Sequence, residues 1–293
     1  MTVPGPGGGA GPARPVACVV LPLPRRAGID EGGPAWSVSR VPAVAGETAD
    51  ELRARAIAEA GAASPGAPGA DVVVVPPPLT SAAPGLVVTD VDSTLITSEV
   101  IEELAAFAGA RDEVARVTAA AMNGEIDFEE SLRRRVAALA GVPDTVFAQV
   151  LGRIRPTPGA GALIEAVHAA GGAFGVVSGG FEEVVGPLAA RMGIDHRVAN
   201  HLEVSGGALT GRVLGEVVTA DVKVRELRRW AGAHGVPMAR TVAIGDGAND
   251  VPMMRAAGLG IAFCAKPSVR AQIPDALSRP DLSPVAEILF PRP

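Results

Sequence analysis

Two aspartates separated by one residue follow a short apolar run in the segment GLVVTDVDSTLITSEVIEELA, residues 85–105. The run Leu86–Thr89 is rich in β-branched residues, which is typical of a buried strand. The two carboxylates therefore stand where a strand ends. In such a pair, one carboxylate could attack an electrophile while the other carries a proton. A pair like this is also common in turns and helix caps, so the chemistry depends on other polar residues converging on it.

Further residues that could contact a ligand follow two later apolar runs and open one later helix. Ser178, Gly179 and Gly180 end the run GVVSGG, and Asp246, Asn249 and Asp250 end VAIGDGAND. Lys223 lies near the start of a predicted helix. Ligands of an open parallel sheet bind outside the carboxyl ends of its strands. We therefore expect these segments to form one site, although they lie far apart in the sequence.

The elements that would carry these residues alternate along the second half of the chain. Apolar periodicity predicts helices over 161–170, 182–192, 221–234 and from Asn249, and strands over 173–177, 241–244 and 260–263. Such alternation is typical of a parallel sheet covered by helices on both faces. Residues 199–215 contain SGG and TG turns, which predict a β-hairpin.

A helical region separates the first of these strands from the rest. Apolar residues recur at helical spacing from Ile101 to Ala108, and residues 111–122 and 127–140 repeat the pattern. Asp127 lies three residues before a glutamate, which predicts a helix cap. We expect a helical cap, inserted at about residues 96–157.

The N-terminal part differs in composition. Residues 1–15 are rich in glycine and proline and are predicted to be disordered. Residues 16–84 combine strand-like runs with a helical pattern over 49–63, which predicts a small α+β module. Residues 79–85, LTSAAPG, are predicted to be a linker.

Composition narrows the classes of function. The net charge of −6 and the lack of a basic run longer than Arg133–Arg135 argue against nucleic acid as a partner. The two cysteines, Cys18 and Cys264, and the four histidines have no metal-ligand spacing. There is no signal-peptide pattern and no apolar run near the ~20 residues of a membrane helix. We expect a cytoplasmic protein that acts on a small molecule, and the sequence leaves open whether it forms a homodimer.

The order of DVDST, SGG, a helix-opening lysine and GDGAND resembles the haloacid dehalogenase (HAD) superfamily of phosphatases over roughly residues 85–275. The insertion is further similar to the phosphoserine phosphatase family in TSEVIEELA and in AMNGEIDFEESLRRRVAAL, residues 121–139. The resemblance implies a Rossmann-like doubly wound sheet over residues 85–293, with the cap after its first strand. It also implies magnesium-dependent hydrolysis of O-phospho-L-serine to L-serine and phosphate, the last step of serine biosynthesis.

The resemblance implies a role for each residue at the strand ends. Asp90 would be the nucleophile that forms an aspartyl-phosphate, and Asp92 the general acid and base. Carboxylates facing a phosphate need a cation between them, and Mg²⁺ prefers hard oxygen ligands. The side chains of Asp90 and Asp246 and the backbone carbonyl of Asp92 would bind this metal. The phosphate would be held by Ser178, Gly179, Gly180 and Lys223, with Asn249 and Asp250 orienting the site.

The cap would recognise the amino-acid end of the substrate. By resemblance, Glu99 would meet the ammonium group and Arg135 the carboxylate, for which a guanidinium fork is well suited. Met122 and Phe128 would be apolar contacts of the cap, although packing within the cap explains both residues nearly as well.

Other functions are weighed against this one. Within the superfamily, a phosphatase or phosphotransferase for another amino-acid-like phosphate, with homoserine as an acceptor, fits the same motifs. From a different class, the N-terminal module could have an ACT-like fold that senses an amino acid, the rest being a relic, but the complete set of motif residues argues against a relic. Phosphonate cleavage through a Schiff base is excluded, because residues 96–157 contain no lysine.

Overall fold

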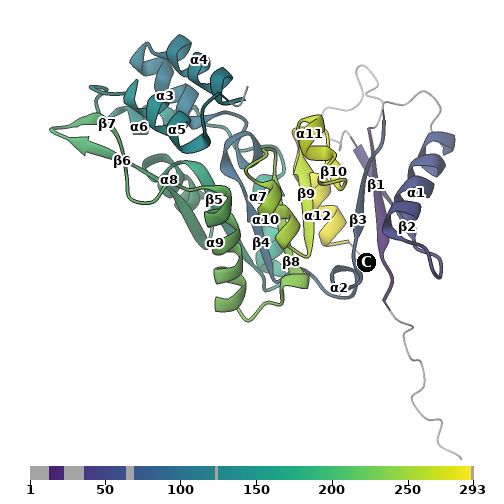
Figure 1. Cartoon of the computed structure of the whole chain (residues 1–293). Helices are drawn as coiled ribbons and strands as arrows, with labels where there is room; N and C mark the ends of the chain where they lie inside the picture. The colour runs from purple at the N-terminus through teal and green to yellow at the C-terminus, as the bar shows by residue number, and fades with distance from the viewer. Residues whose placement is uncertain (1–12, 23–35, 64–68, 123–124, 292–293) are drawn as a thin grey trace, which may run out of the picture.

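The computed structural model describes residues 13–22, 36–63, 69–122 and 125–291 (Figure 1). Most of the predicted disordered tail therefore lies outside the described residues. A seven-stranded sheet forms the centre, in the order β10-β9-β8-β4-β5-β6-β7. Its strands are β4 Leu86–Thr89, β5 Ala173–Phe181, β6 His196–Ser205, β7 Ala208–Leu214, β8 Thr241–Gly245, β9 Leu259–Phe263 and β10 Ala276–Leu277. All its pairs are parallel except β6 with β7.

Helices cover both faces of this sheet, as the alternating pattern predicts. Successive residues of β4 divide between two cores, because side chains alternate across a strand: Val87 belongs to one core, and Leu86 and Val88 belong to the other. The first core contains residues of α7 Ala160–Ala169, α8 Glu182–Met192 and α12 Ser283–Leu289. The second contains residues of α9 Ala220–Ala233, α10 Val251–Ala256 and α11 Pro267–Arg270. The predicted doubly wound α/β fold is confirmed.

The helical cap leaves the sheet after β4. It contains α3 Val100–Ala108, α4 Arg111–Met122, α5 Phe128–Ala137 and α6 Val146–Arg153. The chain leaves and returns side by side, since Ile96 and Pro156 form an isolated β-bridge. The predicted N-terminal capping residue of α5 is also confirmed, because the Asp127 side chain accepts a hydrogen bond of 2.7 Å from the backbone N–H of Glu130.

A separate antiparallel sheet with the order β2-β1-β3 forms the N-terminal module. Its elements are β1 Val16–Pro22, β2 Trp36–Pro42, α1 Ala49–Ala63 and β3 Asp71–Val75. The predicted linker was partly wrong, because α2 Pro77–Ser81 enters it. A proline at the first helical position is well tolerated, since its missing N–H would have no partner there. An ACT-like fold stays a prediction.

The N-terminal sheet packs against the end of the main domain. The Trp36 indole N–H donates to Asp281 at 3.0 Å, and the Asp71 carboxylate accepts from both the backbone N–H and the hydroxyl of Ser278, at 2.8 and 2.9 Å. Arg40 donates to two carbonyl oxygens near the end of α12, at 2.9 and 2.8 Å. Figure 1 shows the module and the cap at opposite ends of the main sheet.

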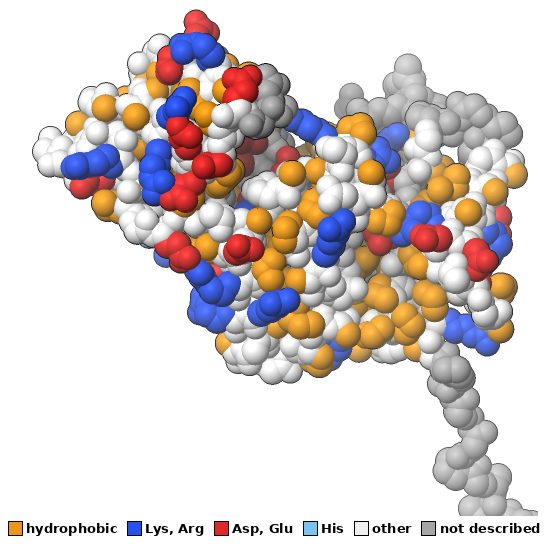
Figure 2. Space-filling model, viewed as in Figure 1, with side chains coloured by type: hydrophobic (Ala, Val, Ile, Leu, Met, Phe, Trp, Pro, Cys, Tyr) orange, Lys and Arg blue, Asp and Glu red, His pale blue; other side chains and the backbone are white. Residues whose placement is uncertain are grey.

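The surface of the described part is chemically mixed. Figure 2 shows acidic side chains interleaved with basic ones over the cap, and hydrophobic side chains more frequent between the cap and the N-terminal module. Within the described ranges, no helix combines the length and apolar character needed to span a membrane.

Candidate active site

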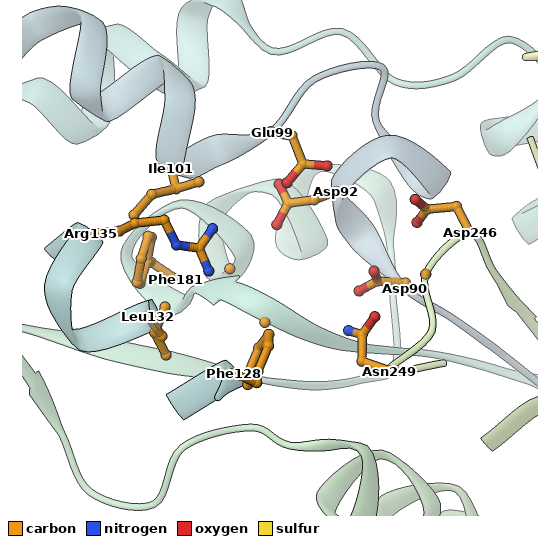
Figure 3. Close-up of a pocket in the computed structure, with 13 residues that line it drawn as sticks. Asp90, Asp92, Glu99, Ile101, Phe128, Leu132, Arg135, Phe181, Asp246 and Asn249 are labelled. Atoms are coloured by element: carbon orange, nitrogen blue, oxygen red, sulfur yellow. The ribbon is translucent and has the colours of Figure 1, made fainter. Parts of the chain in front are cut away.

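The polar residues of three adjacent strands meet beneath the cap. β4 lies between β5 and β8 in the sheet, so Asp90, the Ser178–Gly180 segment and Asp246 come together. A cavity of about 160 Å³ is lined by Asp90, Gly179, Gly180 and Asp246, together with Glu99 and Arg135 from the cap side (Figure 3). The convergence expected from the strand ends is therefore what the structure shows.

A buried lysine joins two of the carboxylates. The Lys223 Nζ lies 2.8 Å from Asp90 Oδ1 and 2.6 Å from Asp250 Oδ1, and the side chains of Lys223 and Asp250 are fully buried. Burial disfavours the charged ammonium, but the charges of Asp250 and Asp90 outweigh this effect and raise the pKa of Lys223. Burial, helped by the charges of Asp250 and Asp92, raises the pKa of Asp90 despite the lysine. The ammonium therefore holds Asp90 in place and offsets part of its charge.

The second aspartate of the motif has a different environment. One oxygen of Asp92 accepts from the backbone N–H of Val100 at 2.8 Å, and the other lies 3.5 Å from the Ser178 hydroxyl. Burial and then the charge of Glu99 raise the pKa of Asp92 to about 7. A carboxyl group with such a pKa can give and take a proton near neutral pH.

The Ser178–Gly180 segment faces Asp92 closely. The Ser178 hydroxyl accepts from the Gly180 N–H at 2.8 Å. A Cβ on Gly180 would lie 2.6 Å from Asp92 Oδ2, so this position requires glycine for its close approach rather than for its backbone angles. The segment also belongs to β5, which continues to Phe181 with a shifted register instead of ending at Val177 as predicted.

Three carboxylates could hold a cation. Oxygens of Asp90, Asp246 and Asp250 lie within 4.8 Å of one another. Burial, followed by the charges of Asp250 and Glu99, raises the pKa of Asp246 to about 6. After burial, the charge of Asp250 contributes to the raised pKa of both Asp90 and Asp246, and all the donors of the cluster are hard oxygen atoms. The cluster is therefore compatible with a metal ion. It includes Asp250, which we expected from the sequence to orient the site rather than to bind the metal.

The cap side of the cavity carries the other charged groups. Figure 3 shows the Arg135 guanidinium pointing into the cavity from the side opposite Asp246. Burial lowers the pKa of Arg135. Glu99 accepts from the Ser93 hydroxyl at 2.6 Å, and Phe128 lines the wall although 37% of it is exposed. Met122 ends α4, and its side chain lies outside the described residues.

Several residues of the site could not be predicted from the sequence. The wall includes Ile101, Leu132, Phe181 and Gly247. Asn200 lies just behind the cavity, where its amide donates to the carbonyl of Gly179. In the sequence, Asn200 is only a polar residue within an expected strand. Its contact with Gly179 becomes visible only in the folded structure.

The fold and site together define a hydrolase of the HAD class. The family model described as haloacid dehalogenase-like hydrolase matches residues 87–255, and the chain belongs to this family.

Individual relatives of this chain share a narrower name than the family model does. The chain is 53% identical over 205 residues to the phosphoserine phosphatase of Streptococcus thermophilus, covering 70% of this chain and 95% of the relative. It is 51% identical over 247 residues to the phosphoserine phosphatase of Streptomyces coelicolor, covering 84% of this chain but only 59% of that longer relative. Among solved structures, a phospho-aspartyl intermediate analogue of phosphoserine phosphatase matches with a TM-score of 0.66 and 40% identity, over 70% of this chain and 99% of that one.

Proposed function

We propose that this protein hydrolyses O-phospho-L-serine to L-serine and phosphate, the final step of serine biosynthesis. The observation that carries the proposal is the two-ended cavity: Asp90 with Lys223 at one end, and Arg135 with Glu99 at the cap end. Such a pocket suits a small molecule with a phosphate at one end and an amino acid at the other. The relatives named phosphoserine phosphatase support the same substrate.

In the first step, a carboxylate oxygen of Asp90 attacks phosphorus. The Asp90 oxygen–phosphorus bond forms as the bond from phosphorus to the serine oxygen breaks, and Asp92 gives its proton to that oxygen. The raised pKa of Asp92, about 7, keeps much of this group protonated near neutral pH. L-Serine leaves, and the phosphoryl group stays on Asp90.

In the second step, water cleaves the aspartyl-phosphate. Asp92, now ionised, takes a proton from the water as its oxygen attacks phosphorus, and the bond to Asp90 breaks. Phosphate is released, and both aspartates return to their starting states. One residue thus acts first as an acid and then as a base, which its pKa near neutrality permits.

The phosphate would be bound by the Ser178 hydroxyl, by backbone N–H groups of Gly179 and Gly180, and by Lys223. The ammonium of Lys223 acts as a point charge near the nonbridging oxygens. Gly179 and Gly180 line the same cavity as Asp90, and the Lys223 Nζ lies 2.8 Å from Asp90 Oδ1.

The acidic cluster would hold Mg²⁺. We assign the side chains of Asp90 and Asp246 and the backbone carbonyl of Asp92 as its ligands. Asp250 is 2.6 Å from Lys223 and accepts from the Gly247 N–H at 3.0 Å, so we assign it to orienting the lysine and the loop. A bound magnesium ion would neutralise phosphate charge and orient the ester.

The cap residues would select the amino acid. Glu99 would pair with the substrate ammonium and Arg135 with its carboxylate, while Phe128 and Met122 would shield the site from water. Asn249, which lines the cavity beside Asp90, would contact the substrate.

Three further assignments belong to this proposal. The chain divides at residues 84 and 85 into an N-terminal module and a HAD domain. Its location is cytoplasmic, which the unpaired thiols of Cys18 and Cys264 support. A homodimer stays a prediction that sedimentation velocity can test.

The test is phosphate release from a panel of esters in the presence of magnesium. Wild-type protein should prefer O-phospho-L-serine to O-phospho-L-homoserine and O-phospho-L-threonine. Asp90→Asn should abolish release, whereas Asp112→Asn, at an exposed position of α4, should leave it unchanged. Equal rates for all esters, or an active Asp90→Asn variant, would refute the proposal.

A further inference from the structure

The β6–β7 hairpin connects the main domain to the cap. β6 starts as a strand of the main sheet beside β5, and its outer half pairs with β7. The hairpin then bonds to the segment after α5: the Gly141 N–H donates to the carbonyl of Leu209 and the Leu209 N–H to that of Val142, both at 2.8 Å. The Asp144 N–H adds a bond of 3.0 Å to the carbonyl of Gly207. Backbone bonds of this kind fix the outer end of the hairpin to the cap (Figure 1).

The base of the hairpin is fixed to the phosphate end of the cavity. Asn200, which is 1% exposed, donates from its amide nitrogen to the carbonyl of Gly179 and accepts from the Val218 N–H, both at 2.8 Å. In a trans peptide the C=O and the next N–H point in opposite directions. By holding the Gly179 carbonyl, Asn200 turns the Gly180 N–H toward the Ser178 hydroxyl, which accepts from it at 2.8 Å. The hairpin therefore starts directly behind the proposed phosphate site.

The outer part of the hairpin lies against the helix that carries Arg135. At the crossing, Gly211 has a φ of +82°, and a Cβ there would lie 3.0 Å from the Cβ of Ala140 and 3.1 Å from the carbonyl oxygen of Ala137. Ala137 ends α5, half a turn beyond Arg135. β7 thus approaches α5 as closely as a glycine allows, and its position sets that of the helix end.

We propose that the β6–β7 hairpin is a strut that fixes the distance between the phosphate end and the carboxylate end of the cavity, and so selects substrates by length. This inference rests on the proposed function, since it takes Arg135 as the partner of the substrate carboxylate. A substrate must reach both ends at once to place its phosphorus at Asp90. One extra methylene in a fitted pocket typically costs a factor of about 10 to 200 in kcat/KM. The site can discriminate against a longer substrate in this way only if the distance between its two ends is fixed.

Two glycines of the hairpin provide a matched test. Gly211→Ala adds a methyl group against α5 and also strains a backbone angle. Gly215→Ala strains a similar angle, since the φ of Gly215 is +74°, but its added methyl group meets no atom within 4 Å. Only the first variant should push α5 and Arg135 away from the phosphate end.

The expected result separates the two ends of the substrate. In Gly211→Ala, the KM for O-phospho-L-serine and the inhibition constant of L-serine should both rise about 10-fold, as for a lost charged contact. Inhibition by inorganic phosphate should stay within about twofold, because the phosphate site is untouched. The ratio of kcat/KM for O-phospho-L-serine to that for O-phospho-L-homoserine should fall about 10-fold, because the variant no longer rejects the extra methylene group as strongly. Gly215→Ala should match wild type in all these constants.

The outcomes also separate this inference from the proposed function. A wild-type protein that releases no phosphate from O-phospho-L-serine refutes the function, and the inference with it. An active wild type whose Gly211→Ala and Gly215→Ala variants behave alike refutes only the strut, as does an equal rise in the L-serine and phosphate constants. If Gly211→Ala does not fold, Leu209→Ala must show the same separation, because it removes a buried side chain next to the bonded cap segment.

Discussion

Lys223→Met tests whether a buried cation holds the carboxylates of the site together. The lysine lies 2.8 Å from Asp90 and 2.6 Å from Asp250, and its side chain is fully buried. Removing one partner of a buried ion pair typically costs about 3–5 kcal/mol, because the remaining charge is left without compensation. Against a total unfolding free energy of about 5–15 kcal/mol, this is a large loss. Methionine is similar in length, so the loss should come from charge rather than from a cavity.

The loss should depend on pH in a defined direction. Lys223 lowers the pKa of Asp90 against the stronger effect of burial, so without the lysine this pKa rises further above its unfolded value. A carboxyl group whose pKa is higher in the folded state loses stability as the pH rises through that folded pKa. Protonation at low pH should therefore relieve the variant. We expect a loss of about 3–5 kcal/mol near pH 7.5 and a clearly smaller one near pH 5.

Urea unfolding at both pH values, followed by circular dichroism, measures this loss. Arg228→Met is the matched control, because Arg228 is an exposed cation on the same helix, where substitutions usually cost less than about 0.5 kcal/mol. A Lys223→Met protein within about 1 kcal/mol of wild type at both pH values would contradict the electrostatic argument. A loss of unfolding free energy that is equally large near pH 5 and near pH 7.5 would also contradict it.

Three further predictions concern catalysis. Glu99→Gln removes a negative charge that raises the pKa of Asp92, so Asp92 should lose its proton at a lower pH and the alkaline limb of the kcat profile should move to lower pH; an unmoved limb contradicts this. Arg135→Lys should raise the KM for O-phospho-L-serine about 10- to 100-fold with kcat nearly kept, because a lysine cannot form the two-pronged contact, whereas the exposed Arg133→Lys should change neither constant. Gly180→Ala should lower kcat at least about 100-fold, since its Cβ would lie 2.6 Å from Asp92 Oδ2, and stopped assays at saturating substrate would show this.

Much of the fold could be predicted because local patterns were strong. The spans of α1, α4, α8 and β4 match their predicted ranges residue for residue. β4 is a short buried run that ends directly before Asp90, so its composition alone marks it as a strand. The convergence of Asp90, Ser178 and Asp246 followed from one rule about parallel sheets, and the order β8-β4-β5 obeys it.

What could not be predicted depends on contacts between distant segments. Asn200 bonds to Gly179, 21 residues earlier, and to Val218, 18 residues later, and no local pattern reveals either contact. Likewise, the docking of the N-terminal sheet depends on Trp36 meeting Asp281, 245 residues later. Such pairs carry no signal in a single sequence, because each residue alone is ordinary.

The hairpin shows the same limit. The hairpin and its SGG turn were predicted, but the TG pair, Thr210–Gly211, lies within β7 and forms no turn. The bonds of Leu209 to the cap were not predicted. Turn residues indicate that a hairpin forms, whereas the surface against which it packs is set by the tertiary fold.

Trapping the aspartyl-phosphate tests whether Asp90 is the nucleophile. Protein mixed with O-phospho-L-serine labelled with ³²P, in the presence of magnesium, would be quenched in acid within milliseconds and digested for peptide mapping. We expect label on the peptide that contains Asp90. This label should be lost on treatment with base or hydroxylamine and should be absent from Asp90→Asn. Turnover of O-phospho-L-serine with no labelled protein at any time, or label on another residue, would contradict it.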